Sequence, residues 1–569
     1  EQWFTSGAAD GFVLRDSGLP GQVARVTDAG TRVITYGYDT TTGRLKSIAD
    51  AADKRQYFDY YADGSLKRMW GQTTYPVEYL YDALGRKTEM HTWRTTDEIW
   101  TGPDWPQNPP EPDVTKWVYD PSSGLLTEKR YADYNPQTGG PKVSYTYSAE
   151  GKMLTRTWAR GVTTTYSYDP ATGEMTGIDY SDSTPDVTFV YDRLGRRKTV
   201  TDAVTGPTGS RTFHYDPATL RLASEAIVAD TNGLYSKTIT RNYQGSGAGQ
   251  VPGRDAGFAI GSEYAVTYHY DAKGRFERIE GPGLAAYGVL YERPADSDAV
   301  EYVRYMNGPN VENEADTLAR TRRACETTRD RLAYVENKAG TGLPLVSRYA
   351  YVNDPAGRRT SVVMTGSAFG DGRLCKWNYN DRSELTTADR HQGTNPDSPG
   401  DRILPSDFDY TYDAIGNRTS YTLDATPTYY CTNALNQYTF TDDAGSTCPN
   451  PPTPVESFTY DADGNLTADG TYTYAWDAEN RLIRVEPVTP VDDVSRKLEF
   501  AYDYMETGDS DLFPRRIIGD CPLFLIRSRT TRSCRPPASA RTIPCWPRSG
   551  HARTSPRARS GSAKRLRAS

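Results

Sequence analysis

Residues 163–178 have the sequence TTTYSYDPATGEMTGI, in which polar and aromatic residues alternate up to Tyr168. Alternation with a period of two predicts a strand. Asp169 can accept hydrogen bonds from the backbone N–H groups ahead of it and so open a type I turn. Gly173 then supplies the positive φ with which a longer hairpin loop ends. This stretch therefore predicts one β-hairpin.

The hairpin pattern recurs along the chain as alternating residues, a Tyr-Asp pair, two or three variable residues, a Gly and a basic or polar residue. The clear copies are Tyr38-Asp39 with Gly43, Tyr81-Asp82 with Gly85, Tyr119-Asp120 with Gly124, Tyr168-Asp169 with Gly173, Tyr191-Asp192 with Gly195, Tyr270-Asp271 with Gly274, Tyr412-Asp413 with Gly416 and Tyr460-Asp461 with Gly464. In Trp476-Asp477 the Gly is replaced by Asn480, and Asn tolerates a positive φ. Tyr215-Asp216 leads to Leu220 instead. These residues are predicted to be structural repeat turns.

The spacing of the turns gives the length of one unit. Gly43, Gly64 and Gly85 are 21 residues apart, which fits two strands and two turns. About a dozen such units imply more strands than the roughly 10 at which open sheets curl or split. We therefore predict an all-β fold in which tandem antiparallel hairpins form a curled, spiralling sheet.

The composition favours a thin wall over a filled core. The chain has 42 Tyr but only 14 Phe, and it is poor in aliphatic residues for its length of 569. Tyr suits a half-buried sheet face, because its ring packs while its hydroxyl stays wet. A hollow shell, or part of one, is therefore expected rather than a solid barrel. The sequence has no apolar run of about 18 residues that would span a membrane, and residues 1–10 do not read as a signal peptide.

The repeated motif YDxxGR resembles the YD or Rhs repeat. The stretch Gln250–Gly261 resembles an interruption within such arrays, and Tyr472–Val485 resembles units near the end of one. The family includes Rhs polymorphic toxins, the B and C components of bacterial Tc toxins, and animal teneurins. The resemblance covers residues 20–505. It implies a spiralling β-shell, secreted or on the bacterial cell surface, which in the toxins encloses a C-terminal toxic polypeptide.

The chain is expected to begin within an array, with an incomplete edge at residues 1–20 and YD repeats at 20–505. Three loop insertions are predicted, near 101–113, 390–405 and 442–454. Residues 311–335 fit a short helix or a degenerate hairpin, and the hairpin is favoured because Cys325–Asp330 imitates a turn.

The repeat pattern stops inside a unit at Met505, and residues 506–569 are rich in Arg, Pro and Ser. Residues 515–569 hold 13 Arg, one Lys and one Asp, whereas the rest of the chain is acidic. One interpretation is a basic tail that binds nucleic acid or an acidic surface. The other, favoured by the break within a unit, is an out-of-frame product. The tail is expected to be disordered or out of frame.

The sequence predicts no catalytic, metal or cofactor site. Its five His have no metal-ligand spacing, and no nucleophile elbow or phosphate loop stands out. Residues 461–465, DADGN, imitate a short calcium loop, although a repeat turn with a second Asp explains them better. The self-cleaving core that closes many Rhs arrays is not found, so the resemblance supplies no catalytic residues. Cys431 and Cys448 flank an apparent loop and form a candidate disulfide.

We expect a non-catalytic scaffold, a segment of an Rhs-type shell that encloses or presents a C-terminal toxin or other cargo polypeptide absent from this chain. The alternative is a carbohydrate-binding or adhesion module for cell-surface glycans, because aromatic sheet faces stack on sugar rings. Its candidate residues are Trp70, Trp93, Trp100, Trp105, Trp117, Trp158 and Trp377. Nucleic acid is expected as a partner only through the basic tail.

Overall fold

The structure, a computed structural model, describes residues 2–502 and 525–526. Within 2–502 it leaves out 7–9, 17–21, 29–31, 95–96, 203–208, 229–235, 248, 285–286, 296, 311–312, 328, 404–406, 444–454 and 490–496. The described residues form β-strands, joined by turns and by the 3-10 helices η1 (Asp97–Trp100) and η3 (Glu314–Asp316). The predicted all-β array of antiparallel hairpins is confirmed.

The strands of the first half are β1 (Gln2–Ser6), β2 (Asp10–Asp16), β3 (Val23–Thr27), β4 (Val33–Tyr38), β5 (Leu45–Ala49), β6 (Arg55–Tyr60), β7 (Leu66–Gly71), β8 (Val77–Tyr81), β9 (Lys87–Thr92), β10 (Asp113–Tyr119), β11 (Leu126–Arg130), β12 (Lys142–Tyr147), β13 (Met153–Thr157), β14 (Thr163–Tyr168), β15 (Met175–Tyr180), β16 (Val187–Tyr191), β17 (Arg197–Asp202), β18 (Ser210–Tyr215), β19 (Leu222–Val228), β20 (Lys237–Tyr243) and β21 (Asp255–Ile260).

The strands of the second half are β22 (Tyr264–Tyr270), β23 (Phe276–Glu280), β24 (Val289–Glu292), β25 (Tyr302–Met306), β26 (Thr317–Glu326), β27 (Arg329–Ala339), β28 (Leu345–Asn353), β29 (Arg359–Thr365), β30 (Arg373–Tyr379), β31 (Leu385–Gln392), β32 (Phe408–Tyr412), β33 (Arg418–Leu423), β34 (Thr426–Thr432), β35 (Tyr438–Asp442), β36 (Glu456–Ser457), β37 (Thr459–Tyr460), β38 (Leu466–Ala468), β39 (Tyr472–Trp476), β40 (Leu482–Pro487), β41 (Leu498–Ala501) and β42 (Leu525–Ile526).

The strands pair in the order in which the chain makes them. In the described part of the chain β1 to β36 form one 36-stranded sheet, and β37 to β42 form a six-stranded one. The backbone N–H of Phe458, between the two, still donates to the carbonyl of Thr439 at 2.9 Å. The two sheets are therefore successive parts of one ribbon of hairpins.

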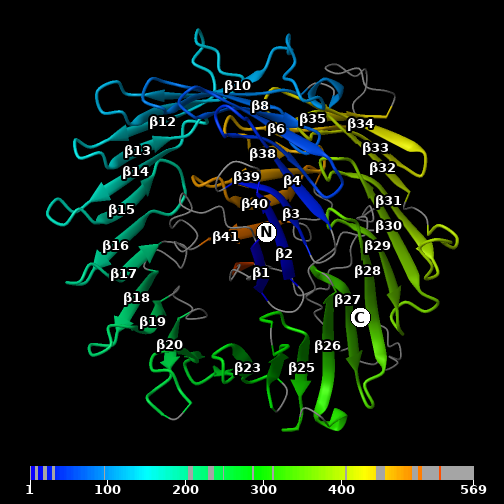
Figure 1. Cartoon of the computed structure of the whole chain (residues 1–569). Coiled ribbons are helices and arrows are strands. Elements are labelled where there is room, and N and C mark those ends of the chain that lie inside the picture. Colours follow the sequence, from blue (N-terminus) through cyan, green and yellow to red (C-terminus); the bar gives the residue numbers. More distant parts are fainter. Residues whose placement is uncertain are drawn as a thin grey trace, which may run out of the picture.

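The ribbon curls back on itself. Figure 1 shows the strands following a curved wall from blue through cyan and green to yellow, after which the orange strands β38–β41 return toward the early ones. The indole N–H of Trp158 donates to the carbonyl of Ala478 at 2.7 Å, across 320 residues of sequence. A sheet this long must curl or split, and this one curls into a spiral of between one and two circuits.

Alternation along each strand gives the ribbon an apolar and a polar face. On the apolar face Ile178 lies opposite Val187, and Phe189 lies opposite Val200, within one buried cluster. A second cluster packs Val362, Cys375, Trp377, Ala388, Phe408 and Tyr410 across β29 to β32. The core is thus a lining along one side of the sheet, which is why few aliphatic residues suffice.

The structure can be compared with three predictions about where segments begin and end. Residues 317–326 and 329–339 form an antiparallel hairpin, so the hairpin interpretation of 311–335 is confirmed. The insertion predicted to begin at residue 390 begins later, because β31 stays paired through Gln392 with Arg373. The sheet also extends before residue 20, since β1 pairs with β2 and β2 pairs with β3. In the described chain no helix is long and apolar enough to cross a membrane.

Candidate functional site

Each Tyr-Asp turn is organised by its Asp carboxylate. In the turn after β8, Asp82 Oδ1 accepts the backbone N–H groups of Leu84 at 2.9 Å and Arg86 at 3.0 Å. The N–H of Gly85 donates to the Asp82 carbonyl at 3.0 Å, and Gly85 has a φ of +76°. Arg86 Nε donates to the second carboxylate oxygen at 2.8 Å. The motif therefore satisfies its own backbone donors without help from the rest of the fold.

The positive φ persists where Gly is replaced. Asn480 has a φ of +57°, and Leu220 has a φ of +60°. A branched side chain in this region costs about 1–2 kcal/mol. The Leu220 N–H nevertheless donates to the Asp216 carbonyl at 2.8 Å, as the glycines do in the other longer turns. The hydrogen bonds of the turn, rather than the residue at its end, hold this backbone conformation.

The Tyr of most turns binds the preceding unit. The Tyr81 hydroxyl donates at 3.0 Å to the carbonyl of Leu66, the first residue of the return strand one unit earlier. The same bond joins Tyr38 to Val23 (2.9 Å), Tyr119 to Lys87 (2.9 Å), Tyr168 to Met153 (2.9 Å), Tyr191 to Met175 (2.8 Å), Tyr270 to Asp255 (2.7 Å) and Tyr412 to Leu385 (2.8 Å). Phe would lack this hydroxyl, which accounts for the excess of Tyr.

The basic residue after the turn Gly binds the following unit. Arg86 Nη1 donates to the carbonyl of Gly124 at 2.9 Å, and its guanidinium lies 4.5 Å from the centre of the Tyr119 ring. Arg196 likewise lies 4.0 Å from the ring centre of the next motif tyrosine, Tyr215. A cation–π contact of this kind contributes about 0.5–1 kcal/mol at an exposed site. Tyr and Arg thus link each unit backward and forward along one edge of the ribbon, a role that the sequence analysis did not assign.

A second arrangement appears where the ribbon overlaps itself, which we call the seam. There the Tyr-Asp turns of residues 381–480 sit on the connecting loops, at the opposite ends of the hairpins, of residues 54–184. The hydrogen bonds across the seam span 294 residues between Thr184 and Ala478 and 338 residues between Arg94 and Thr432. One circuit of the ribbon therefore takes roughly the same length of chain wherever it is measured.

An aromatic cluster between β9 and β10, of which only Trp105 lies in the first predicted insertion, receives one seam turn. Trp93, Trp100 and Ala414 are 2%, 1% and 0% exposed and form one cluster, with Trp105 packed against it. Trp93 Nε1 donates to the carbonyl of Pro110 at 2.7 Å, which ties the insertion to β9. The segment between β9 and β10, which includes the insertion predicted at 101–113, therefore builds a seat for a turn more than 300 residues away.

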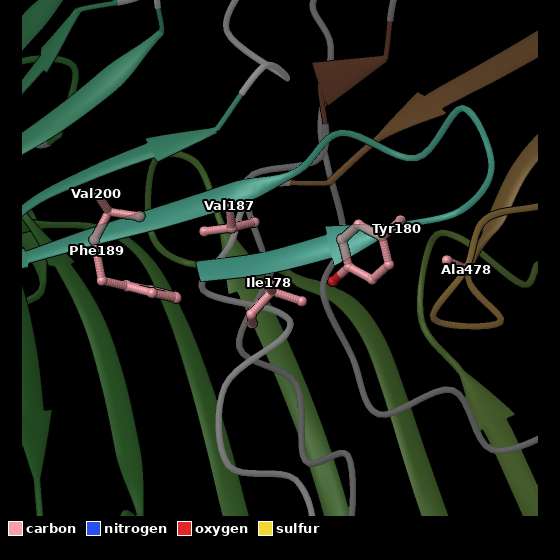
Figure 2. Packing of buried hydrophobic residues seen from close by; sticks show 6 residues of the cluster. All are labelled: Ile178, Tyr180, Val187, Phe189, Val200 and Ala478. Carbon is pink, nitrogen blue, oxygen red and sulfur yellow. The ribbon is translucent and has the colours of Figure 1, made fainter. Parts of the chain in front are cut away.

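A second seam turn is held by polar and apolar contacts together. Ala478 is 0% exposed and packs with Tyr180 and Ile178 at the end of β15. Figure 2 shows Ala478 on its loop beside Tyr180. The N–H of Ala478 donates to Thr184 Oγ1 at 2.8 Å, and the Trp158 indole donates to its carbonyl. A larger side chain at residue 478 would not fit this site.

Arg160 is the most heavily bonded cation of the seam. Its guanidinium lies 3.3 Å from Asp461 Oδ2 and 3.0 Å from Asp463 Oδ2, and it also donates to the carbonyl of Asp477. The Asp463 side chain is fully buried, and burial raises its pKa. Beside it, Arg156 binds Glu479 at 2.7 Å. The carboxylates of the calcium-like motif therefore face an arginine.

Burial reverses the titration of the turn Asp. In the exposed turn, the backbone N–H of Arg86 is the main cause that lowers the pKa of Asp82. Asp413 Oδ1 accepts equivalent bonds from Ile415 at 3.1 Å and Asn417 at 2.8 Å. Its pKa is nevertheless raised, because desolvation in the seam outweighs those bonds. The motif is the same, and the sign of the shift depends on where it sits.

The other candidates from the sequence are a disulfide, a metal site and a set of tryptophans. Cys431 is disulfide-bonded, as is Cys375, whereas Cys448 lies outside the described residues. In the described residues no group of three His, Cys, Asp or Glu side chains could hold a metal ion. Trp70, Trp93, Trp100 and Trp377 are buried, with exposures of 6% or less, so these four rings are packing residues and cannot stack on a sugar.

Solved structures share this fold. The Photorhabdus luminescens Tc holotoxin pore with the TccC3-D651A mutation matches 87% of this chain and 27% of that chain, with a TM-score of 0.54 and 14% identity. The crystal structure of TcdB2-TccC3 matches 84% of this chain and 26% of that chain, with a TM-score of 0.52 and 14% identity. The chain has the fold of the Rhs/YD shell of these Tc toxins, and it spans about a quarter of their length.

Curated proteins match only a short stretch. The tRNA nuclease WapA of Bacillus subtilis and the tRNA3(Ser)-specific nuclease WapA of Bacillus spizizenii are each 38% identical over 82 residues, which is 14% of this chain and 3% of the nuclease. No family model matches the chain.

Proposed function

We propose that the chain is a non-catalytic wall segment of an Rhs-type shell, secreted or on the cell surface, that encloses or presents a cargo polypeptide. The seam is the observation that carries this proposal. A ribbon whose late turns seat on its early loops, as Ala414 does on Trp93 and Trp100, makes a continuous curved wall. The cargo would be a toxin polypeptide absent from this chain, by analogy with the Tc toxins that share the fold.

The carboxylates of the Tyr-Asp turns serve the structure of the ribbon. The Asp carboxylates of the motif are occupied by backbone N–H groups and by Arg side chains, as in Asp82 and Asp192. We propose residues 20–505 as the repeat array, whose sheet β1 and β2 continue before residue 20, and residues 506–569 as a basic tail from which Leu525–Ile526 pairs with β41. The short likeness to the WapA nucleases does not extend an activity to this chain, because it covers 3% of those proteins.

Small-angle X-ray scattering of the purified chain tests the shell. A filled globule of this length would have a radius of gyration of about 25 Å. A hollow wall is expected to exceed this value and to give a distance distribution depleted near the centre. Arg160→Ala, which breaks the seam, should widen the distribution further. A filled, compact particle that Arg160→Ala leaves unchanged would rule out the proposal.

The carbohydrate alternative now rests on fewer residues. Trp158 is held by its bond to Ala478, and four other tryptophans are buried, so Trp105 and Trp117 are the remaining candidates. Trp105 packs at 5.3 Å from the ring centre of Trp93. A glycan array on which the chain and its Trp117→Ala variant give the same signal would remove this alternative.

A further inference from the structure

Most of the Tyr-Asp edge of the ribbon lies outside the seam, and three of its turns there expose a leucine. Leu84, Leu194 and Leu220 are 76%, 62% and 54% exposed, and each belongs to a Tyr-Asp turn on this edge. Single exposed leucines are ordinary, so these three matter because the same edge of the ribbon forms an interface in the seam. These turns are held by their own hydrogen bonds, so the leucines are not needed to form them.

One of these exposed turns has nearly the sequence of a seated one. Residues 82–85 are Asp-Ala-Leu-Gly, and residues 413–416 are Asp-Ala-Ile-Gly. In the seam Ala414 is 0% exposed against Trp93 and Trp100. The matching Ala83 is exposed, and so is Leu84. The exposed turn is therefore of the same kind as a turn that this chain already seats in its own seam.

The opposite edge of the ribbon is also apolar beyond the seam. Tyr264, Tyr287 and Leu318 are 37%, 41% and 47% exposed, and all three flank connecting loops later than Thr184. In the seam the equivalent loops carry the aromatic residues that receive Ala414 and Ala478. Outside the seam, one chain therefore presents an exposed Tyr-Asp edge and an exposed connecting-loop edge. These exposed parts of the two edges do not contact each other.

We propose that a second copy of this chain docks its connecting-loop edge on the exposed Tyr-Asp edge, repeating the geometry of the internal seam. A second copy fits because both edges belong to ribbons of the same hairpin length and curvature. The contact joins two different edges, so it is heterologous and can repeat from copy to copy. It rests on the fold alone and does not require that the wall enclose cargo.

Sedimentation velocity of the full chain over a wide concentration range tests the docking. The wild type is expected to associate, and the double variant Leu84→Glu/Leu194→Glu to raise the dissociation constant at least about tenfold. The matched control, Thr188→Glu/Thr240→Glu, adds the same charge at exposed mid-strand positions and should associate as the wild type does. A wild type that stays monomeric throughout overturns the proposal, as does a control that loses association equally.

A mixing experiment tests the head-to-tail arrangement. Tyr264→Glu/Leu318→Glu blocks the connecting-loop edge, so this variant and Leu84→Glu/Leu194→Glu should each remain monomeric alone. Mixed in equal amounts they should form a dimer that grows no further, because each supplies one intact edge. Circular dichroism of each variant confirms folding. Two folded variants that stay monomeric when mixed would contradict the arrangement, while the scattering result on the shell would be unaffected.

Discussion

The turns at residues 82–85 and 413–416 share a motif, a set of hydrogen bonds and a positive φ at their Gly, yet they occupy opposite environments. Ala83 is exposed, whereas the matching Ala414 is fully buried under two tryptophans. The same carboxylate has a lowered pKa in the first turn and a raised one in the second. The comparison shows that each turn is held by its own hydrogen bonds. The spiral then either leaves the turn exposed to solvent or buries it against an earlier loop.

Breaking the seam charge should have the largest effect. Arg160→Ala leaves the fully buried Asp463 carboxylate without its cation, which costs about 3–5 kcal/mol when a buried pair loses one partner. Arg55→Ala removes an exposed pair with Asp53 and should cost at most about 1 kcal/mol. Urea unfolding measures both. Equal losses in the two variants would mean that the seam contributes no more than the surface.

Adding one methyl group to each turn glycine should separate local strain from burial. Gly85→Ala is expected to cost about 1–2 kcal/mol, because its φ is +76° and a Cβ would meet nothing within 4 Å. Gly416→Ala should cost more, since its Cβ would lie 2.5 Å from the Tyr75 hydroxyl. Thermal unfolding of both variants gives the difference, and a smaller loss at Gly416 would contradict the packed seam.

Enlarging the Ala of each turn probes the aromatic seat directly. Ala414→Leu forces a larger side chain against Trp93 and Trp100, and overpacking of this kind costs about 1–3 kcal/mol. Ala83→Leu lies on the exposed edge and should change stability by no more than about 0.5 kcal/mol. Near-ultraviolet circular dichroism should report the disturbed tryptophans in the first variant only. A silent Ala414→Leu spectrum would argue against the seat.

The smallest effect is a difference in pH dependence. Asp82 has a folded pKa below 3.8, so its carboxylate stabilises the fold above pH 3.8 and this contribution is lost as pH falls through the lowered value. Asp413 has a raised pKa, so its contribution is present below pH 3.8 and is lost as pH rises through the raised value.

Asn variants make this difference measurable. Asp82→Asn should therefore lose more stability at neutral pH than at acid pH. Asp413→Asn should show the opposite trend, with a smaller loss at neutral pH than at acid pH. Unfolding free energies of the wild type and both variants across this range give the two slopes. Slopes of the same sign would show that burial does not reverse the titration.

The repeat unit could be predicted because its signals are local. Asp169 and Gly173 lie four residues apart, and they define a turn whatever surrounds it. The roles of the motif Tyr and Arg were missed, although both belong to the motif. Their partners, such as Leu66 for Tyr81 and Gly124 for Arg86, lie in neighbouring units. The excess of Tyr over Phe was the available signal, since only the hydroxyl distinguishes the two rings.

The sequence alone determined that this chain is a ribbon of Tyr-Asp hairpins, where each turn falls, and that a sheet of such length must curl. Only the tertiary structure decided which turns are buried. That choice depends on the length of one circuit, as in the 320 residues between Trp158 and Ala478. The circuit length is set by small twists added over many strands, and no local stretch of sequence contains that sum. Two turns of almost identical sequence can therefore have opposite environments.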